Sequence, residues 1–111
     1  LGAELVVTTE DGSLGDAGRI IAPLDGRLAE RPGPAPVMIY ACGPEGMLAA
    51  CAKAAARHAR PCQVSVERIM GCGMGGCYSC VVPMRDAGGG FHHVRACIAG
   101  PVLAGDRIRW D

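Results

Sequence analysis

The sequence has few aromatic residues, 4% of 111, and no excess of either charge, because Lys plus Arg and Asp plus Glu number 11 each. A neutral chain is poorly suited to polyanionic nucleic acid or to an anionic membrane surface. No apolar run approaches the roughly 20 residues of a membrane-spanning helix, and no basic, apolar secretory leader is recognisable. These absences predict a cytoplasmic protein whose main function involves neither nucleic acid nor a membrane.

Large apolar side chains are also scarce. The hydrophobic fraction is 50%, but many of these residues are Ala and seven are Cys. A chain of this length forms one ordinary domain or two very small ones and buries roughly two thirds of its unfolded surface. Since small side chains make that core thin, a bound metal or a partner is expected to support folding.

The first part of the chain alternates strand-like and helix-like patterns, which is typical of an α/β fold with a parallel sheet. The apolar run at 37–42 has the composition of a strand buried on both faces. Pro44 is expected in the first turn of the helix that follows. The predicted strands are 5–8, 37–42 and 62–67, and the predicted helices are about 16–30, kinked at Pro23, and about 44–59.

This order predicts only part of a doubly wound parallel sheet. A complete nucleotide-binding sheet of that kind has five or six strands and a G-x-G-x-x-G turn after the first, and this chain has neither. Residues 1–67 are therefore predicted to be the C-terminal half of a dinucleotide-binding domain. Residues 68–111 are rich in Gly and Cys and are predicted to form a small β-rich module, with a hairpin from 80–85 and 91–96 and short strands at 102–103 and 107–110.

Four cysteines in the second part have the spacing of metal ligands. Cys72, Cys77, Cys80 and Cys97 follow the pattern C-x4-C-x2-C-x16-C, the arrangement of plant-type 2Fe-2S sites, with the fourth cysteine expected from a distant strand. Thiolates and bridging sulfides together form an anion, and a loop around an anion must turn its backbone N–H groups inward. The glycines between the first cysteines permit such turns. The spacing therefore predicts that these four residues ligate iron.

Other interpretations of the cysteines stay open on spacing alone. Zinc is common in sites of four cysteines, although its structural sites usually consist of two C-x2-4-C pairs, and Cys97 has no near partner. Such a site would make the chain a zinc-stabilised interaction module without redox function. The thiols could also be uncoordinated. A Rieske site needs two histidines, but four cysteines already fill the ligand positions, so His92 and His93 are expected on the surface of the hairpin.

Two predicted strand ends carry candidate nucleotide-binding residues, because the carboxyl ends of parallel strands line the ligand crevice of such sheets. The first group, Cys42, Gly43 and Pro44, precedes a helix N-terminus, which attracts phosphate. The second group consists of Thr9, Glu10, Asp11, Gly12 and Ser13. Simple packing of Cys42 and an ordinary polar turn at 9–13 are the alternatives. Cys51 and Cys62 are predicted to be packed small hydrophobic residues.

Several stretches match the pattern of a known family. They are L-V-V-T-T-E-D-G-S at 5–13, Y-A-C-G-P-E-G-M-L at 40–48, E-R-I-M-G-C-G-M-G-G-C-Y-S-C at 67–80 and C-I-A-G-P-V at 97–102. With these stretches the sequence resembles the electron-transfer subunit of dihydroorotate dehydrogenase B, within the ferredoxin-NADP reductase superfamily. The resemblance covers most of the chain.

The resemblance implies a function in pyrimidine biosynthesis. The family's full subunit carries a flavin-binding barrel, a nicotinamide-binding domain and a 2Fe-2S module, and it passes electrons from a partner FMN subunit that oxidises dihydroorotate, through the cluster, to FAD and on to NAD(P). By this resemblance Cys72, Cys77, Cys80 and Cys97 ligate the iron, Cys42 and Gly43 lie near the nicotinamide, and the turn at 9–13 approaches the dinucleotide. The barrel and the first half of the nucleotide domain are expected to precede Leu1, so the chain alone is expected to relay single electrons without turnover.

The chain departs from the family pattern at three positions. Glu10 stands where Asp is frequent, Ser79 where Gly is frequent before the third cluster cysteine, and Ala99 where an acidic residue is common. None of these differences removes a predicted ligand. Reductase subunits of the same modular type that serve a hydrogenase or a ferredoxin share much of the layout, and they remain an alternative identity.

Overall fold

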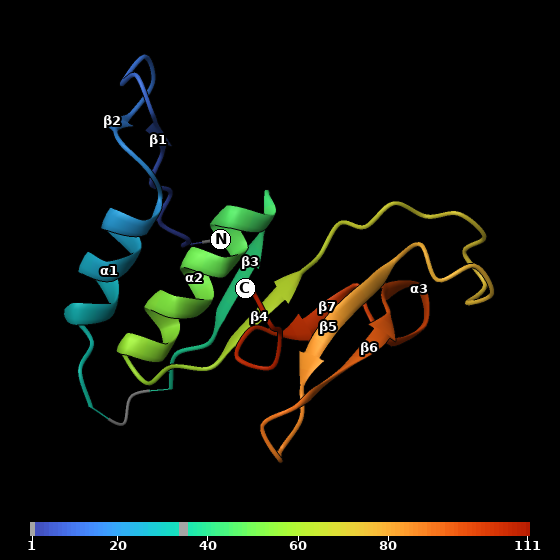
Figure 1. Ribbon diagram of the computed structural model, residues 1–111. Coiled ribbons are helices and arrows are strands. Elements are labelled where there is room, and N and C mark those ends of the chain that lie inside the picture. The colour runs from blue at the N-terminus through green and yellow to red at the C-terminus, as the bar shows by residue number, and fades with distance from the viewer. Residues whose placement is uncertain (1, 34–35) are drawn as a thin grey trace. The chain divides into compact units, whose positions relative to one another are not determined.

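The computed structural model describes residues 2–33 and 36–111. The chain divides into two compact units, Leu1–Ala35 and Pro36–Asp111, and the predicted domain division after residue 67 falls inside the second of them (Figure 1). Within the described residues no helix is long and apolar enough to cross a bilayer. Mixed α/β structure with several small sheets is confirmed.

The first unit differs from the sequence prediction at both of its elements. Strand β1 (Thr8–Thr9) begins later than the predicted strand at 5–8 and pairs in parallel with β2 (Asp16–Ala17). Because residues 16–17 are taken up in that pairing, helix α1 (Ile21–Ala29) starts at Ile21 rather than near residue 16. The predicted kink at Pro23 is wrong, because Pro23 lies in the first turn, where the backbone N–H has no partner within the helix.

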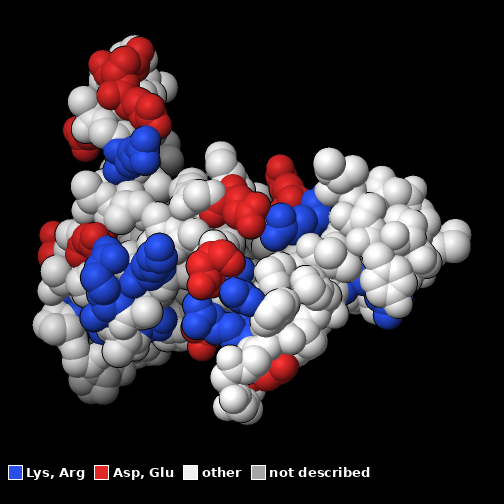
Figure 2. All heavy atoms as spheres, in the orientation of Figure 1, with Lys and Arg blue, Asp and Glu red and all other residues white. Residues whose placement is uncertain are grey.

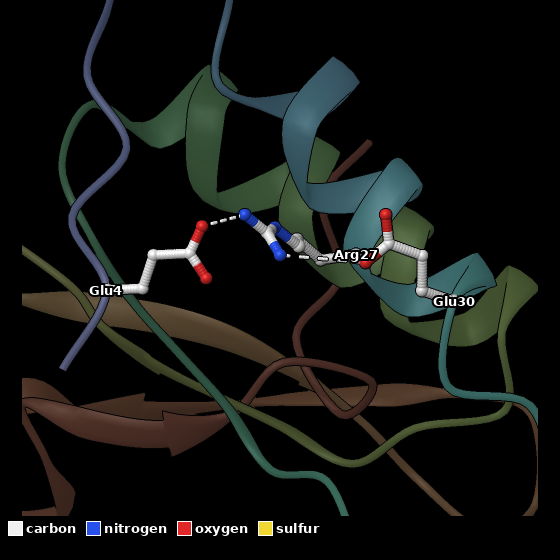
Figure 3. Close-up of polar contacts among 3 residues, drawn as sticks. All are labelled: Glu4, Arg27 and Glu30. Carbon is white, nitrogen blue, oxygen red and sulfur yellow. Dashed lines mark hydrogen bonds and ion pairs between the residues drawn. The ribbon is translucent and has the colours of Figure 1, made fainter. Parts of the chain in front are cut away.

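Arg27 connects α1 to the segment before β1. Figure 3 shows its guanidinium between two carboxylates, those of Glu4 and Glu30. The Glu30 contact is an i,i+3 pair on the helix surface, with 3.6 Å between Nη1 and Oε2. All three side chains are at least half exposed, so each pair stabilises the unit by no more than about 1 kcal/mol.

The second unit is built on a three-stranded sheet in the order β3-β4-β7. Strands β3 (Ile39–Cys42) and β4 (Cys62–Ser65) are parallel, with Ile39 opposite Cys62, and helix α2 (Glu45–Arg57) connects them. Strand β7 (Val102–Ala104) is antiparallel to β4 and confirms the strand predicted at 102–103. The two parallel strands joined by a helix are the part of the predicted parallel sheet that is present among the described residues.

Helix α2 and the sheet enclose the core of this unit. Glu45 in the first turn and Arg57 in the last turn oppose the partial charges of the helix ends. Pro44 is the N-cap residue, one position before the predicted first turn. Cys51 and Cys62 are both buried, as predicted. The helix face that packs on the sheet consists mostly of small residues, and its buried members are Leu48, Cys51, Ala52, Ala54 and Ala55.

The rest of the second unit is a hairpin that is preceded by a long loop. Strands β5 (Val81–Arg85) and β6 (Phe91–Arg95) pair antiparallel, which confirms the predicted hairpin. A single helical turn, α3 (Ala96–Ala99), follows β6. The predicted strand at 107–110 is reduced to one bridge between Met84 and Ile108. Residues 66–80 run without helix or strand from the end of β4 to the start of β5 (Figure 1).

Candidate metal centre

The first predicted ligand, Cys72, is the focus of several backbone amides. Its sulfur accepts hydrogen bonds from the N–H groups of Gly76 at 3.2 Å and of Met74 and Cys77 at 3.4 Å. These amides converge because the loop between Cys72 and Cys77 folds back on itself. They lower the pKa of Cys72 to about 6, with the Met74 amide as the largest cause. The loop thus stabilises a negative sulfur at this position.

The sulfur of the second predicted ligand, Cys77, is hydrogen-bonded to a side chain, that of Ser79. The hydroxyl of Ser79 lies 3.1 Å from the Cys77 sulfur and is the largest cause of the lowered pKa of Cys77. The same oxygen accepts a hydrogen bond from the N–H of Gly71 at 2.9 Å and lies 3.1 Å from the carbonyl oxygen of Ile69, which competes with the Cys77 sulfur for its single proton. Ser79, at a position where the family frequently has Gly, therefore closes the base of the loop.

Gly71 allows the backbone to pass close to Cys77 and Ser79 at the base of the loop. A Cβ at residue 71 would lie 2.6 Å from the Cys77 sulfur and 3.0 Å from the Ser79 oxygen. Both distances are shorter than van der Waals contact, so any side chain at this position would displace Cys77 or Ser79. The glycine is needed here for space next to a predicted ligand.

Cys80 and Cys97 form a second pair at the top of the hairpin. Cys80 directly precedes β5 and is 3% exposed, whereas Cys97 lies in α3 and not in a strand as predicted. After β6 the chain enters this helical turn, whose first residue, Ala96, donates its N–H to the Cys80 carbonyl at 3.0 Å. The backbone amide of Cys97 lowers the pKa of Cys80, and the Cys80 side chain raises the pKa of Cys97.

The four thiols therefore belong to one region but stand as two pairs, Cys72 with Cys77 and Cys80 with Cys97. The pairs interact electrostatically, through Cys72 and Cys97. Within residues 2–33 and 36–111, no three or more His, Cys, Asp or Glu side chains converge closely enough to hold a metal ion as they stand. A shared metal centre would thus require the two pairs to move together.

The two histidines lie on the hairpin, as predicted, and both are exposed. The Nδ1 atom of His92 is hydrogen-bonded to the Asp86 carboxylate, and the ring of His93 packs edge-on against Phe91. Each histidine therefore interacts with another residue of the hairpin.

The loop chemistry predicts a pH-dependent order of thiol reactivity in the metal-free chain. Because the thiolate is the nucleophile and the pKa of Cys72 is about 6, alkylation of Cys72 should rise with pH through 6 and level off by pH 7. Cys51 should remain unmodified in the folded chain at pH 7, since burial raises its pKa and blocks access. Mass spectrometry after brief iodoacetamide treatment gives the order, and equal labelling of Cys72 and Cys51 contradicts it.

The predicted nucleotide-binding turn at 9–13 lies in the first unit and is closed by hydrogen bonds among residues 9–14. The Thr9 hydroxyl donates to the carbonyl of Leu14 at 2.9 Å, and the Ser13 N–H donates to the Asp11 carboxylate at 3.0 Å. This N–H is the largest cause of the lowered pKa of Asp11. Gly12 closes the turn through its N–H to the Thr9 carbonyl. Glu10 is 3.6 Å from Arg19.

The other predicted nucleotide-binding group lies in the second unit, at the carboxyl end of β3. Cys42 is the last residue of the strand and is exposed, and Gly43 and Pro44 lead directly into α2. Glu45 then forms two hydrogen bonds with Arg68, at 3.1 and 3.2 Å. Arg68 thereby fixes the start of the cysteine loop to the first turn of α2.

Sequence reasoning missed two residues that shape this region. Arg68 was given no role, although it binds Glu45, and its Nε atom is buried without a hydrogen-bond partner. Arg95 was also overlooked; its guanidinium donates to the Gly75 carbonyl at 2.6 Å. Both contacts join residues at least 20 positions apart, and no periodic pattern in the sequence indicates them.

Comparison with known proteins finds matches to the cysteine region and to most of the chain. Residues 67–109 match the family described as the iron-sulfur cluster binding domain of dihydroorotate dehydrogenase B. The chain is 34% identical over 105 residues to the dihydroorotate dehydrogenase B (NAD(+)) electron transfer subunit of Caldanaerobacter subterraneus, covering 95% of this chain and 40% of that protein. It is 50% identical over 82 residues to the probable subunit of the same name from Methanopyrus kandleri, covering 74% of this chain and 30% of that protein.

A solved structure gives a consistent result. The chain superimposes with a TM-score of 0.72 and 30% identity on a structure described as an NADH-dependent reduced ferredoxin-NADP oxidoreductase, studied for flavin-based electron bifurcation. The match covers 96% of this chain and 35% of that one. The chain thus spans 40% or less of the length of these three proteins. The resemblance predicted from the sequence is confirmed.

Proposed function

Because residues 67–109 match the iron-sulfur domain family of dihydroorotate dehydrogenase B, we propose that this chain is the C-terminal part of an electron-transfer subunit. In this proposal Cys72, Cys77, Cys80 and Cys97 hold a 2Fe-2S cluster. The observation that carries the proposal is the loop itself, in which three backbone amides point at one predicted ligand sulfur.

The donor set fits an iron–sulfur cluster. All four predicted ligands are sulfurs, and Cys72, Cys77 and Cys80 already have lowered pKa values because amide and hydroxyl groups donate to them. Ligands must be deprotonated to bind a metal, so lowered pKa values reduce the cost of binding near neutral pH. The remaining requirement is that the pair of Cys80 and Cys97 approaches the pair of Cys72 and Cys77.

When bound, a 2Fe-2S cluster accepts and releases one electron at a time. The residues of this chain hold and tune it. The amides of Met74, Gly76 and Cys77 stabilise negative charge on the Cys72 sulfur, and the Ser79 hydroxyl stabilises charge on Cys77. Hydrogen bonds to ligand sulfurs are among the main determinants of the reduction potential of such centres. We expect these hydrogen-bond donors to stabilise the reduced form of the cluster.

We further propose that residues 1–67 are the C-terminal half of an NAD(P)-binding domain with a doubly wound parallel sheet, and that 68–111 are the cluster-binding module. The parallel strands β3 and β4 joined by α2 support this assignment. Cys42, Gly43 and Pro44 would face the nicotinamide, and Thr9, Glu10, Asp11, Gly12 and Ser13 would approach the dinucleotide. FAD and NAD(P) would bind to the full-length subunit, which is longer than this chain.

The proposed electron donor is an FMN-containing dihydroorotate dehydrogenase subunit. Docking is supported by the surface over the cysteine loop, which is largely uncharged in Figure 2. Residues 69–80 contain no charged side chain, and several large apolar side chains there are exposed. An exposed apolar surface of this kind marks an interaction site. Its members are Ile69, Met70, Met74, Tyr78 and Ile98.

A second candidate is a subunit of the same modular type that reduces a ferredoxin. The observation in its favour is the superposition on the NADH-dependent reduced ferredoxin-NADP oxidoreductase over 96% of this chain. Both candidates use the same cluster and differ in the protein with which it exchanges electrons, an FMN subunit in the first and a ferredoxin in the second. Copurification of the full-length subunit with its partner, followed by identification of the partner's flavin, distinguishes them.

Metal analysis of the anaerobically purified chain tests the proposed function. We expect equal amounts of iron and acid-labile sulfide, two of each per chain, with visible absorption that bleaches on addition of dithionite. If the cluster is lost during purification, the same iron, sulfide and absorption measurements are made after reconstitution with iron and sulfide. A colourless chain that holds one zinc per molecule and resists reconstitution contradicts the proposal and identifies a zinc-stabilised module instead.

A further inference from the structure

The side chain of Arg95 connects the cysteine loop to the segment that carries the fourth cysteine, Cys97. Arg95 is the last residue of β6, where it pairs with Val81, and it lies two residues before Cys97. Its guanidinium donates a hydrogen bond to the carbonyl oxygen of Gly75, with 2.6 Å between the nitrogen and the oxygen. Since the loop has no regular structure of its own, this contact attaches it to a residue whose backbone the hairpin fixes.

The same guanidinium packs against Tyr78. The Cζ atom of Arg95 lies 4.9 Å from the centre of the Tyr78 ring, within the range of a cation–π contact. Tyr78 follows Cys77 directly and has a φ of 61°. A tyrosine holds such a left-handed conformation only where its surroundings impose it. Arg95 supplies one of the contacts that keep this residue, and hence Cys77, in place.

Gly75 is the loop residue that contacts the end of β6 and α3. Its carbonyl accepts the hydrogen bond from Arg95. Gly75 is buried with a φ of 88°, and a Cβ there would lie 2.2 Å from the Cδ1 atom of Ile98 and 3.6 Å from the Nη1 atom of Arg95. The middle of the loop is therefore packed against Arg95 at the end of β6 and Ile98 in α3, and Arg95 is the charged member of the two.

We infer that Arg95 is a positioning residue that holds the loop of Cys72 and Cys77 against the turn of Cys97, and that its positive charge raises the reduction potential of the cluster. The second half of this inference rests on the proposed function. Reduction adds negative charge to an already anionic centre, so a fixed cation nearby stabilises the reduced form more than the oxidised form. Arg95 is half-buried, which weakens screening of its charge by salt.

Redox titration of three variants of the cluster-loaded chain tests the charge effect. Arg95→Gln removes the charge and should lower the ratio of reduced to oxidised centre at a fixed potential about tenfold, equal to ~59 mV for one electron. Arg95→Lys keeps the charge but lacks the planar guanidinium, and we expect its ratio within about twofold of the parent chain. Equal potentials for Arg95→Gln and the parent chain would overturn this half of the inference.

Arg109→Gln is the matched control. Arg109 also stacks on an aromatic ring, with its Cζ atom 4.3 Å from the centre of Phe91, and its loss changes the net charge equally. Phe91 lies four residues before Arg95 on β6, which is about 13 Å along the strand. The control should therefore leave the potential within about twofold in the reduced-to-oxidised ratio. A shift equal to that of Arg95→Gln would show that net charge, and not the position of Arg95, is responsible.

The positioning role is tested separately in the metal-free chain, so it can be judged even if no cluster forms. Amide hydrogen exchange at Gly76 and Cys77, whose N–H groups donate to the Cys72 sulfur, should be at least about tenfold faster in Arg95→Gln than in the parent chain, because the loop loses its attachment. Exchange in α2, measured in the same NMR experiment, should be equal in the variant and the parent chain, which shows that the variant folds. Unchanged exchange at Gly76 and Cys77 would overturn the positioning role.

Discussion

Replacing Cys97 with alanine should abolish the metal centre. The variant is expected to retain less than about a tenth of the iron of the parent chain, since even residues behind the ligands typically cost 10–100-fold in metal affinity when changed. Cys97 is the single predicted ligand outside the loop of Cys72, Cys77 and Cys80, so it decides whether the hairpin and the loop share one centre. Iron, sulfide and the visible spectrum after reconstitution provide the measurement.

Cys42→Ala is the matched control for this prediction. Cys42 is also a free cysteine with an accessible side chain, but it lies at the end of β3, outside the predicted ligand set. This variant should keep the iron and the colour of the parent chain. If Cys97→Ala keeps its full complement of iron, or if Cys42→Ala loses it, the assignment of the fourth ligand is wrong.

The largest expected effect on stability comes from Leu48. Its side chain is 1% exposed between α2 and the sheet, among residues that are mostly Ala. Truncation to alanine removes buried apolar surface and leaves a cavity that small neighbours cannot fill. The free energy of unfolding should therefore fall by about 2–5 kcal/mol, a large share of the roughly 5–15 kcal/mol typical of a domain. Urea denaturation followed by circular dichroism measures this change.

Leu5→Ala provides the comparison with the same chemical change at the surface. Leu5 is 84% exposed, so its truncation should alter the free energy of unfolding by no more than about 0.5 kcal/mol. Similar effects for Leu48→Ala and Leu5→Ala would mean that α2 does not pack against the sheet as described. A changed denaturant slope in either variant would instead indicate a change in the unfolded state or a loss of two-state behaviour.

The elements that could be predicted are those with a local cause in the sequence. Helix α2 follows from an apolar stripe bounded by Pro44 and Pro61, and the hairpin of β5 and β6 follows from a run of glycines between two strand-like segments. The spacing of the cysteines predicted an iron–sulfur site, and residues 67–109 match an iron-sulfur cluster binding domain.

The elements that could not be predicted depend on contacts that leave no pattern in the sequence. Strand β2 exists because Asp16 and Ala17 pair with Thr8 and Thr9, and two-residue strands leave no pattern. The helical turn that carries Cys97 is too short for periodicity, and it is tied to the start of β5 by the hydrogen bond from the Ala96 N–H to the Cys80 carbonyl. The role of Arg95 depends on a loop carbonyl 20 residues earlier in the chain.

The most direct measurement of the central claim is X-ray absorption at the iron edge of the reconstituted chain. If Cys72, Cys77, Cys80 and Cys97 hold a 2Fe-2S cluster, each iron should have only sulfur neighbours, and a second iron should contribute to the scattering. The same measurement on Cys97→Ala should lose the iron–iron contribution. Iron surrounded by nitrogen or oxygen, or a spectrum without a second iron in the reconstituted parent chain, would contradict the account.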